Sequence, residues 1–358
     1  MSMPFEPWHE IICPSLEEAS VVLLGLPFDG AACARRGAAQ APARIRMLSG
    51  LPTRFNEDGL APRHFKLFDA GDLPFPPGEP EKGDGGEREA AATPEKPAKV
   101  KETIDAADRA GGEKADPGAA CREDEVLHYF ATAEVRALEL LHSGRFCLFL
   151  GGDHSVSIPL VRAFARAHTG KKVGLLHFDA HPDLLDTYEG RAWSHACTQR
   201  RSLEQQGLDP EDMALIGVRS FMEEEAAFLA AHPEMTVFRV REIYRRGAEA
   251  VAQEIIARFR DYDSLYMTID IDVLDPAYAP GTGTPDAGGL STRELLELVR
   301  VIAGALPVKA ADVVEVSPPL DTGDITSLAA LKVIYELLAA VLLREEKNRE
   351  DHAAGESA

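Results

Sequence analysis

Short apolar runs alternate with segments of helical periodicity along most of the chain, and this alternation predicts the elements of the fold. The expected strands are eight short runs rich in aliphatic and β-branched residues, at 19–26, 66–69, 146–150, 171–178, 213–217, 236–240, 265–269 and 313–316. The expected helices lie between them, at 42–48, 123–142, 158–164, 223–231, 249–259, from 291 onward and at 325–343. Such alternation predicts a parallel sheet covered by helices on both faces. A doubly wound open sheet and a closed (β/α)8 barrel both fit the pattern.

Residues 77–120 interrupt this pattern. Pro, Gly, Glu, Lys, Asp and Ala dominate the segment, in which Val100 and Ile104 are the only large aliphatic residues. Such a composition buries too little apolar surface to offset the entropy of ordering, so it predicts no fixed packed structure. The roughly 75 residues before it are few for an independent α/β domain, which favours an insertion over a domain boundary. We therefore expect a single domain over 1–345 with this insertion, followed by a flexible acidic tail at 346–358.

Charge and cysteine content narrow the class of protein. The net charge of −21 argues against binding to nucleic acid or to anionic membranes, and it is compatible with a cationic substrate. The five cysteines are scattered and form no C-x-x-C pair, which favours a reducing, cytoplasmic setting. Residues 1–10 lack the basic and apolar regions of a signal peptide. The longest aliphatic run, at 337–343, is too short to cross a bilayer.

Metal-capable side chains follow two of the expected strands at a spacing of two residues. Asp179, His181 and Asp183 come directly after the run at 171–178, and they would point to one side of an extended chain. A turn is the alternative, because the Asp-Ala-His-Pro-Asp run contains turn-forming residues. Asp270 and Asp272 repeat the spacing after the run at 265–269. Two carboxylates this close repel each other unless a cation or a proton separates them.

Two further polar residues fall at strand ends. His154 follows the run at 146–150 within Gly-Gly-Asp-His-Ser, and Glu315 lies at the end of the last expected strand. The carboxyl ends of parallel strands are where α/β proteins bind their ligands. The candidate metal ligands are therefore two histidines and four aspartates: His154, Asp179, His181, Asp183, Asp270 and Asp272.

Six ligands are more than the three that a catalytic zinc takes from a protein, and they suit two divalent ions that share carboxylates. A ligand set that is rich in oxygen and contains imidazole favours Mn²⁺, although such a set also binds Fe, Co, Ni and Zn. Two such ions can hold a water molecule and lower its pKa, which provides hydroxide near neutral pH. Four aspartates cancel the charge of the two ions, and the hydroxide and Glu315 make the site negative. Such a site repels phosphate esters and favours a cationic substrate.

Seven motifs, in the same order along the chain, resemble those of the ureohydrolase family of arginases and agmatinases. They are Gly-Leu-Pro-Phe-Asp-Gly at 25–30, Gly-Gly-Asp-His-Ser at 151–155, Phe-Asp-Ala-His-Pro-Asp at 178–183, Thr-Ile-Asp-Ile-Asp-Val-Leu-Asp-Pro at 268–276, Ala-Pro-Gly-Thr-Gly-Thr-Pro at 279–285, Gly-Gly-Leu at 288–290 and Val-Val-Glu-Val-Ser-Pro-Pro-Leu-Asp at 313–321. The resemblance implies a three-layer α/β/α fold with a parallel eight-stranded sheet. It also implies a binuclear manganese centre with two Mn²⁺ per chain, and a homo-oligomer, either a trimer or a hexamer.

The resemblance also implies a role for each polar residue. The ligands form three pairs, of which the first bridges the ions and the others each complete one ion: Asp179 with Asp270, His154 with Asp183, and His181 with Asp272. His195 matches the family histidine that protonates the leaving amine, which is a poor leaving group without a general acid. Glu315 matches the glutamate that pairs with the guanidinium, and Asp183 can accept a hydrogen bond from the hydroxide. Asp153 is expected to cap the next helix, and His177 to lie in the core or beside the ligands.

Two departures from the family pattern bear on the substrate. Arginases carry a Ser-Gly-Asn run shortly before the catalytic histidine, where this chain reads Arg-Ala-Trp-Ser at 191–194, so an amino-acid substrate is disfavoured. Many agmatinases read His-Gly-Thr where this chain reads His-Ala-Cys at 195–197. The resemblance is greatest to agmatinases, and it implies hydrolysis of agmatine to putrescine and urea. A guanidino acid, guanidine, arginine or a formimidoyl compound is the alternative substrate, and an inactive polyamine-binding paralogue is the alternative that is not an enzyme.

Overall fold

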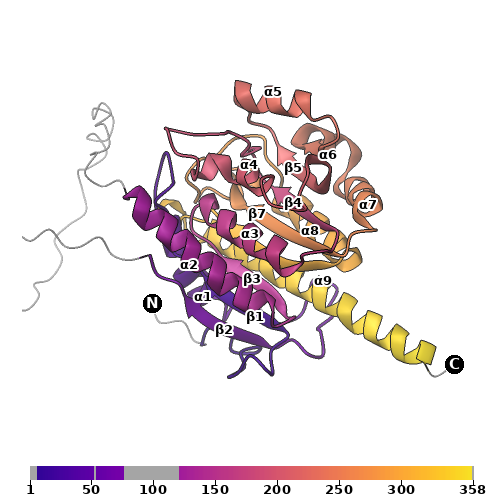
Figure 1. Cartoon of the computed structure of the whole chain (residues 1–358). Helices are drawn as coiled ribbons and strands as arrows, with labels where there is room; N and C mark the ends of the chain where they lie inside the picture. Colours follow the sequence, from indigo (N-terminus) through magenta and orange to yellow (C-terminus); the bar gives the residue numbers. More distant parts are fainter. Residues whose placement is uncertain (1–5, 52–53, 76–120, 357–358) are drawn as a thin grey trace, which may run out of the picture.

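All eight expected strands form, and they pair in one parallel sheet (Figure 1). The computed structural model describes residues 6–51, 54–75 and 121–356. The strands are β1 Val21–Gly25, β2 Leu67–Asp72, β3 Phe146–Leu150, β4 Val173–Phe178, β5 Met213–Val218, β6 Thr236–Arg239, β7 Ser264–Asp270 and β8 Val308–Val314. Their order is β2-β1-β3-β8-β7-β4-β5-β6, and every neighbouring pair is parallel. Because β2 and β6 are the two ends of this order and do not pair with each other, the sheet is open and the barrel alternative is excluded.

Helices cover both faces of the sheet, which gives the three layers that the resemblance implies (Figure 1). They are α1 Ala41–Leu48, α2 Glu123–Leu141, α3 Ser157–Ala167, α4 Thr198–Ser202, α5 Glu223–Ala231, α6 Val240–Arg246, α7 Ala248–Phe259, α8 Thr292–Ala305 and α9 Ile325–Glu356. Side chains of α1, α7, α8 and α9 form one apolar core, and those of α2 and α3 form the other. Alternate residues of β1 supply the two cores, Val21 and Leu23 to the first and Val22 and Leu24 to the second.

Several element boundaries differ from the expectation. The expected strand through Val240 ends at Arg239, where α6 begins instead, and α6 stops at Gly247 with a φ of 84°. The last strand begins five residues earlier than expected, at Val308, although it contains the polar Asp312. Burial of Asp312 is tolerated because its Oδ2 accepts hydrogen bonds from Tyr266 Oη at 2.8 Å and Ser157 Oγ at 2.6 Å.

The last helix is longer than its apolar run. We expected it to end at 343, but α9 continues to Glu356. Exposed charges support the extension, since Arg349 pairs with Glu345 one turn earlier. By length and composition α9 could cross a membrane, but 83% of its apolar window is buried inside the protein, as in the core helix of a soluble protein. The expected insertion at 77–120 lies outside the described residues, so that expectation stays a prediction.

Two glycines allow the turn after β3 to approach its neighbours closely. A Cβ on Gly152 would lie 1.7 Å from the carbonyl oxygen of Phe28, and a Cβ on Gly151 would lie 2.5 Å from Val314 Cγ1. Asp153 follows them, and its Oδ1 accepts a hydrogen bond from Ser155 N, which confirms its expected capping role. The turn therefore carries His154 between the end of β8 and the loop after β1.

Replacing Gly152 with Ala should destabilise the protein by about 3 kcal/mol or more, because the added methyl group overlaps a backbone atom that no side-chain rotation can move. Gly304→Ala is the matched control. Gly304 lies inside α8 with open space around it, so this change should be neutral or stabilising by up to about 1 kcal/mol. Urea denaturation curves of the two variants would test both expectations. An unchanged midpoint for Gly152→Ala would contradict the close approach.

Candidate metal centre and active site

The structure brings all six expected metal ligands together at the carboxyl edge of the sheet. They follow three strands, β3, β4 and β7, and Glu315 follows a fourth, β8. These four strands are the consecutive central strands of the sheet, in the order β3-β8-β7-β4. The topology therefore gathers residues from four distant parts of the chain at one place.

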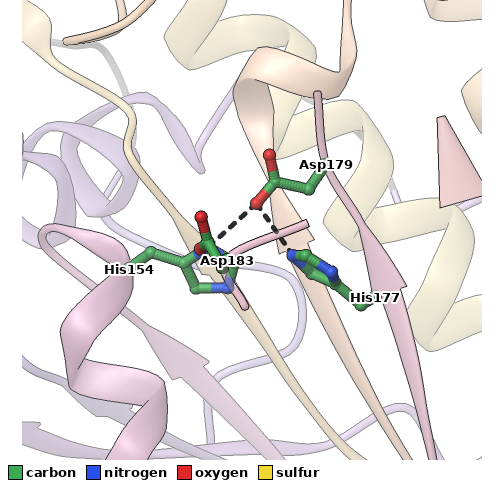
Figure 2. Close-up of side chains that lie close together, drawn as sticks. All are labelled: His154, His177, Asp179 and Asp183. Atoms are coloured by element: carbon green, nitrogen blue, oxygen red, sulfur yellow. Dashed lines mark hydrogen bonds and ion pairs between the residues drawn. The ribbon is translucent and has the colours of Figure 1, made fainter. Parts of the chain in front are cut away.

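His154 lies at the centre of the first group of ligands. Three carboxylate oxygens surround its Nδ1, namely Asp183 Oδ2 at 2.9 Å, Asp179 Oδ2 at 3.1 Å and Asp270 Oδ2 at 3.3 Å. Figure 2 shows His154 with Asp179 and Asp183. The other ring nitrogen, Nε2, lies 2.9 Å from the hydroxyl of Thr268. This hydrogen bond fixes the ring so that Nδ1 faces the carboxylates.

His181 forms the second group with Asp179 and Asp272. Its Nδ1 lies 3.2 Å from Asp272 Oδ2 and 3.3 Å from Asp179 Oδ1. Asp179 thus directs one oxygen toward each group, which is the geometry of a bridging carboxylate. Asp270 contacts His154 in the first group through Oδ2, while its Oδ1 accepts a hydrogen bond from Asp272 N at 2.8 Å.

The backbone reaches this arrangement by turning, which corrects the expected extended run through Asp183. Strand β4 ends at Phe178, and Asp183 adopts a φ of 55°. Glu315 has a φ of 61°. Positive φ values are uncommon for residues other than glycine, and they occur preferentially at functional sites, where the surrounding structure compensates for the strain.

Burial and mutual repulsion shift the pKa values of the carboxylates. Burial is the larger cause that raises the pKa of Asp270 well above its usual value, followed by repulsion from Asp272 and Asp179. Burial and then Asp179 raise the pKa of Asp272 in the same direction. Burial would also raise the pKa of Asp179, but the neighbouring histidines His177 and His154 lower it well below its usual value. Divalent cations between these groups would relieve the same repulsion, so the donor set fits a metal centre.

His177 supports the centre from the side. Its Nε2 lies 2.8 Å from Asp179 Oδ2, and its side chain is completely buried (Figure 2). His154 Nδ1 approaches the same oxygen. His177 therefore lies beside the ligands, which is one of the two positions that we expected for it, and it orients the shared carboxylate of Asp179.

The expected general acid lies beside the expected guanidinium partner. His195 Nδ1 lies 3.3 Å from Glu315 Oε1, and this oxygen also accepts a hydrogen bond from His154 N at 2.8 Å. Burial lowers the pKa of His195, but interactions with Cys33 and Glu315 outweigh it and raise the pKa well above its usual value. The raised pKa favours the protonated imidazole, which is the form that a general acid needs.

A pocket of about 150 Å³ opens over the ligands and His195. It is lined by Cys33, His181, Asp183, Leu185, Tyr188, His195, Ala196, Met222, Glu225, Asp270, Asp272 and Thr284. No motif or spacing in the sequence marks Cys33, Tyr188 or Glu225 as pocket residues. Burial raises the pKa of Glu225 to about 7, although its carboxylate accepts hydrogen bonds from two backbone N–H groups. It lies in an ordinary acidic helix start, where no local signal marks a pocket residue.

Other supporting residues lay within quoted motifs or had no motif at all. Thr284 donates a hydrogen bond to Asp272 Oδ2 at 3.2 Å, and Thr268 anchors His154, so each hydroxyl fixes one ligand. Arg219, at the end of β5, donates to the carbonyl oxygens of Asp272 and Asp286, each at 2.7 Å. This guanidinium ties the loop after β7 to the end of β5, two strands away in the sheet. Only contacts between distant residues reveal its role.

An open parallel sheet whose central strands converge on a His/Asp cluster, next to an imidazole with a raised pKa, fits a metal-dependent hydrolase. The sequence model described as the Arginase family matches residues 19–340, so the chain belongs to the arginase family, whose members are binuclear metal enzymes. An agmatinase of Bacillus anthracis is 33% identical over 327 residues, which cover 91% of this chain and 93% of that protein. A guanidinopropionase of Pseudomonas aeruginosa is 34% identical over 333 residues, covering 92% and 88%.

Solved structures agree with this assignment. The crystal structure of a hypothetical agmatinase from Burkholderia thailandensis superposes with a TM-score of 0.74 at 28% identity, covering 96% of this chain and 92% of that one. A proclavaminate amidino hydrolase from Streptomyces clavuligerus superposes with a TM-score of 0.69 at 30% identity, covering 90% and 91%. The chain is thus a hydrolase that acts on a guanidino C–N bond.

Metal binding should weaken as the pH falls. Opposing carboxylates raise the pKa values of His154 and His181, and burial with repulsion raises those of Asp270 and Asp272. Groups with raised pKa values hold protons at higher pH, and these protons must leave before a metal binds. Apparent metal affinity should therefore rise with pH through the neutral range. Calorimetric Mn²⁺ titrations at several pH values would measure this, and a pH-independent affinity would contradict it.

The matched variants for this titration are Asp183→Asn and Asp186→Asn. Asp183 lies 2.9 Å from His154 Nδ1, so its loss of charge should lower metal occupancy. Asp186 is only three residues away, but its side chain is 61% exposed and pairs with Arg201, so its amide variant should bind metal normally.

Proposed function

We propose that the protein hydrolyses agmatine to putrescine and urea with two Mn²⁺ per chain. The observation that carries this proposal is the charge of the pocket. Its lining contains four carboxylates, Asp183, Glu225, Asp270 and Asp272, and no Lys or Arg among the described residues. A substrate with a guanidinium at one end and an ammonium at the other matches this lining. A carboxylate tail would meet these carboxylates and no Lys or Arg among the described lining residues.

The chain's own residues support a binuclear centre. Asp179 would bridge the ions, with His154 and Asp183 on one side and His181 and Asp272 on the other. Asp270, which faces His154, would complete the bridge. When bound, the ions supply a water molecule acidic enough to act as a nucleophile near neutral pH. The oxygen-rich donor set with two imidazoles supports manganese.

His195 supplies the proton that the leaving amine needs. Glu315 holds Nδ1 of His195 in place. Nε2 of the same imidazole is buried and has no hydrogen-bond partner among the described residues. Nε2 is therefore the atom from which we propose transfer to the amine nitrogen, because an unprotonated amine leaves slowly. Glu315 orients this imidazole and, by resemblance to the family, pairs with the substrate guanidinium. Asp183 would position the attacking water through a hydrogen bond.

His195→Ala should lower turnover by about 10²–10⁴-fold, because the general acid is lost while the ligands remain. His232→Ala is a suitable control, since His232 lies on the surface at the end of α5, where it pairs with Glu234. Urea release and metal content should be measured on both variants. Loss of metal from the His195 variant would place this residue among the ligands, and wild-type turnover would assign the proton transfer to another group.

The substrate assignment is tested by comparing agmatine with 4-guanidinobutyrate, which replaces the terminal ammonium with a carboxylate. Facing the carboxylate-lined pocket, the anionic tail is repelled, so kcat/KM should be at least about tenfold higher for agmatine. The assay is urea released by the manganese-loaded protein. A preference for the acid would favour the alternative of a guanidino-acid hydrolase, in line with the guanidinopropionase relative. Absence of urea from every guanidino compound would favour a polyamine-binding role.

We also propose a cytoplasmic homo-oligomer, without nucleic-acid or membrane partners. The net charge of −21 supports the absence of those partners. Exposed apolar side chains near one another in sequence, Met47, Leu51, Phe55 and Leu60, support a contact between copies.

A further inference from the structure

Cys33 brings a thiol to the active-site pocket from a distant part of the chain. It lies in the loop between β1 and α1, and it lines the pocket together with His195 and Tyr188. Its side chain is partly exposed, so a small molecule that enters the pocket can reach it. No step proposed above uses this thiol.

The Cys33 thiol affects the pKa values of two pocket residues. It is the first cause that raises the pKa of Tyr188, and its interaction with His195 contributes to the raised pKa of that imidazole. The rings of Tyr188 and His195 are themselves in contact, with centroids 6.5 Å apart in an edge arrangement. The three side chains therefore form one cluster at the pocket wall.

His195 is the basic side chain of this cluster. Only 12% of its side chain is exposed, and its Nε2 is buried without a hydrogen-bond partner among the described residues. Burial lowers the pKa of this imidazole, but interactions with Cys33 and Glu315 outweigh it and raise the pKa. The thiolate is the form of a cysteine that attacks disulfides and other electrophiles, and Cys33 shares the wall of an accessible pocket with this imidazole.

The other four cysteines lack this combination. Cys13, Cys147 and Cys197 are buried, and burial raises the pKa of the Cys147 and Cys197 thiols to about 12. Cys121 is partly exposed, but burial is the main cause that raises its pKa, and it does not line the pocket. Buried thiols are inert toward such reagents, so the accessible thiol in the pocket wall is the one that we expect to be modified.

We propose that Cys33 is a thiol-modification site through which a small-molecule disulfide closes the active-site pocket. The proposal rests on the proposed function, because closure is read as loss of guanidine hydrolysis. The geometry that carries it is the location of Cys33 against the general acid, in a pocket of about 150 Å³. An adduct larger than the thiol itself occupies the space that the substrate needs.

The step is a thiol–disulfide exchange. The Cys33 sulfur, after losing its proton to water, attacks one sulfur of the small disulfide. The original S–S bond breaks, a new one joins Cys33 to half of the reagent, and the other half departs as a thiolate that takes up a proton. Cys33 is oxidised and the departing half is reduced, so electrons balance. An excess of a small thiol reverses the step.

The test uses the manganese-loaded full-length protein and oxidised glutathione. Urea release should fall by at least about tenfold, because an adduct of tripeptide size and the substrate cannot share this pocket. Peptide mass analysis should locate the adduct on Cys33 before any other cysteine, and dithiothreitol should remove the adduct and restore activity. Agmatine present during the treatment should slow the modification.

Cys33→Ser and Cys121→Ser are the matched variants, each compared with its own untreated activity. The first should resist oxidised glutathione, and the second should remain as sensitive as the wild type. An unmodified Cys33, or a modified Cys33 with full activity, would overturn the proposal. A wild-type protein that releases no urea before treatment would instead overturn the proposed function, while the mass analysis still reports whether Cys33 is the selective site.

Discussion

The site depends on one buried carboxylate, that of Asp179, which two groups of ligands share and which lies among other acidic side chains. Asp179 directs Oδ2 to His154 Nδ1 at 3.1 Å and Oδ1 to His181 Nδ1 at 3.3 Å, so one side chain fixes the spacing of the two ligand groups. Asp270 and Asp272 are buried beside it. Burying a charge costs several kcal/mol unless opposite charge and hydrogen bonds accompany it. Cations bound between these carboxylates would lower that cost.

The order of the strands in the sheet explains how residues distant in sequence meet at the site. His154 and Glu315 are 161 residues apart in sequence, yet their hydrogen bond spans only 2.8 Å because β3 and β8 are neighbours. Parallel strands end at one edge, so each central strand delivers its ligands to the same place. Gly151 and Gly152 then allow the turn after β3 to pack directly against β8 and the loop after β1.

The fold, and the residues that it gathers into the His/Asp cluster, could be predicted because their signals are local. Buried parallel strands are continuous apolar runs, and the ligands sit in short motifs at their ends. The features that the sequence did not predict depend on contacts between distant residues, which local patterns do not encode. Asp312 is buried in β8, where Tyr266 and Ser157 donate hydrogen bonds to its Oδ2, and the positive φ of Asp183 follows from its surroundings. The role of Cys33 rests on a loop that meets Tyr188 and His195 only in three dimensions.

The double orientation of Asp179 has a thermodynamic consequence. A carboxylate that serves two ions makes their affinities interdependent, since an ion in one position alters the charge and alignment available to the other. Linkage requires this effect to be reciprocal, so each ion changes the affinity of its neighbour by the same factor. Loading is then a cooperative or anticooperative equilibrium rather than two independent ones. A population filled with a single ion per chain is a distinct species whose abundance is set by that coupling free energy.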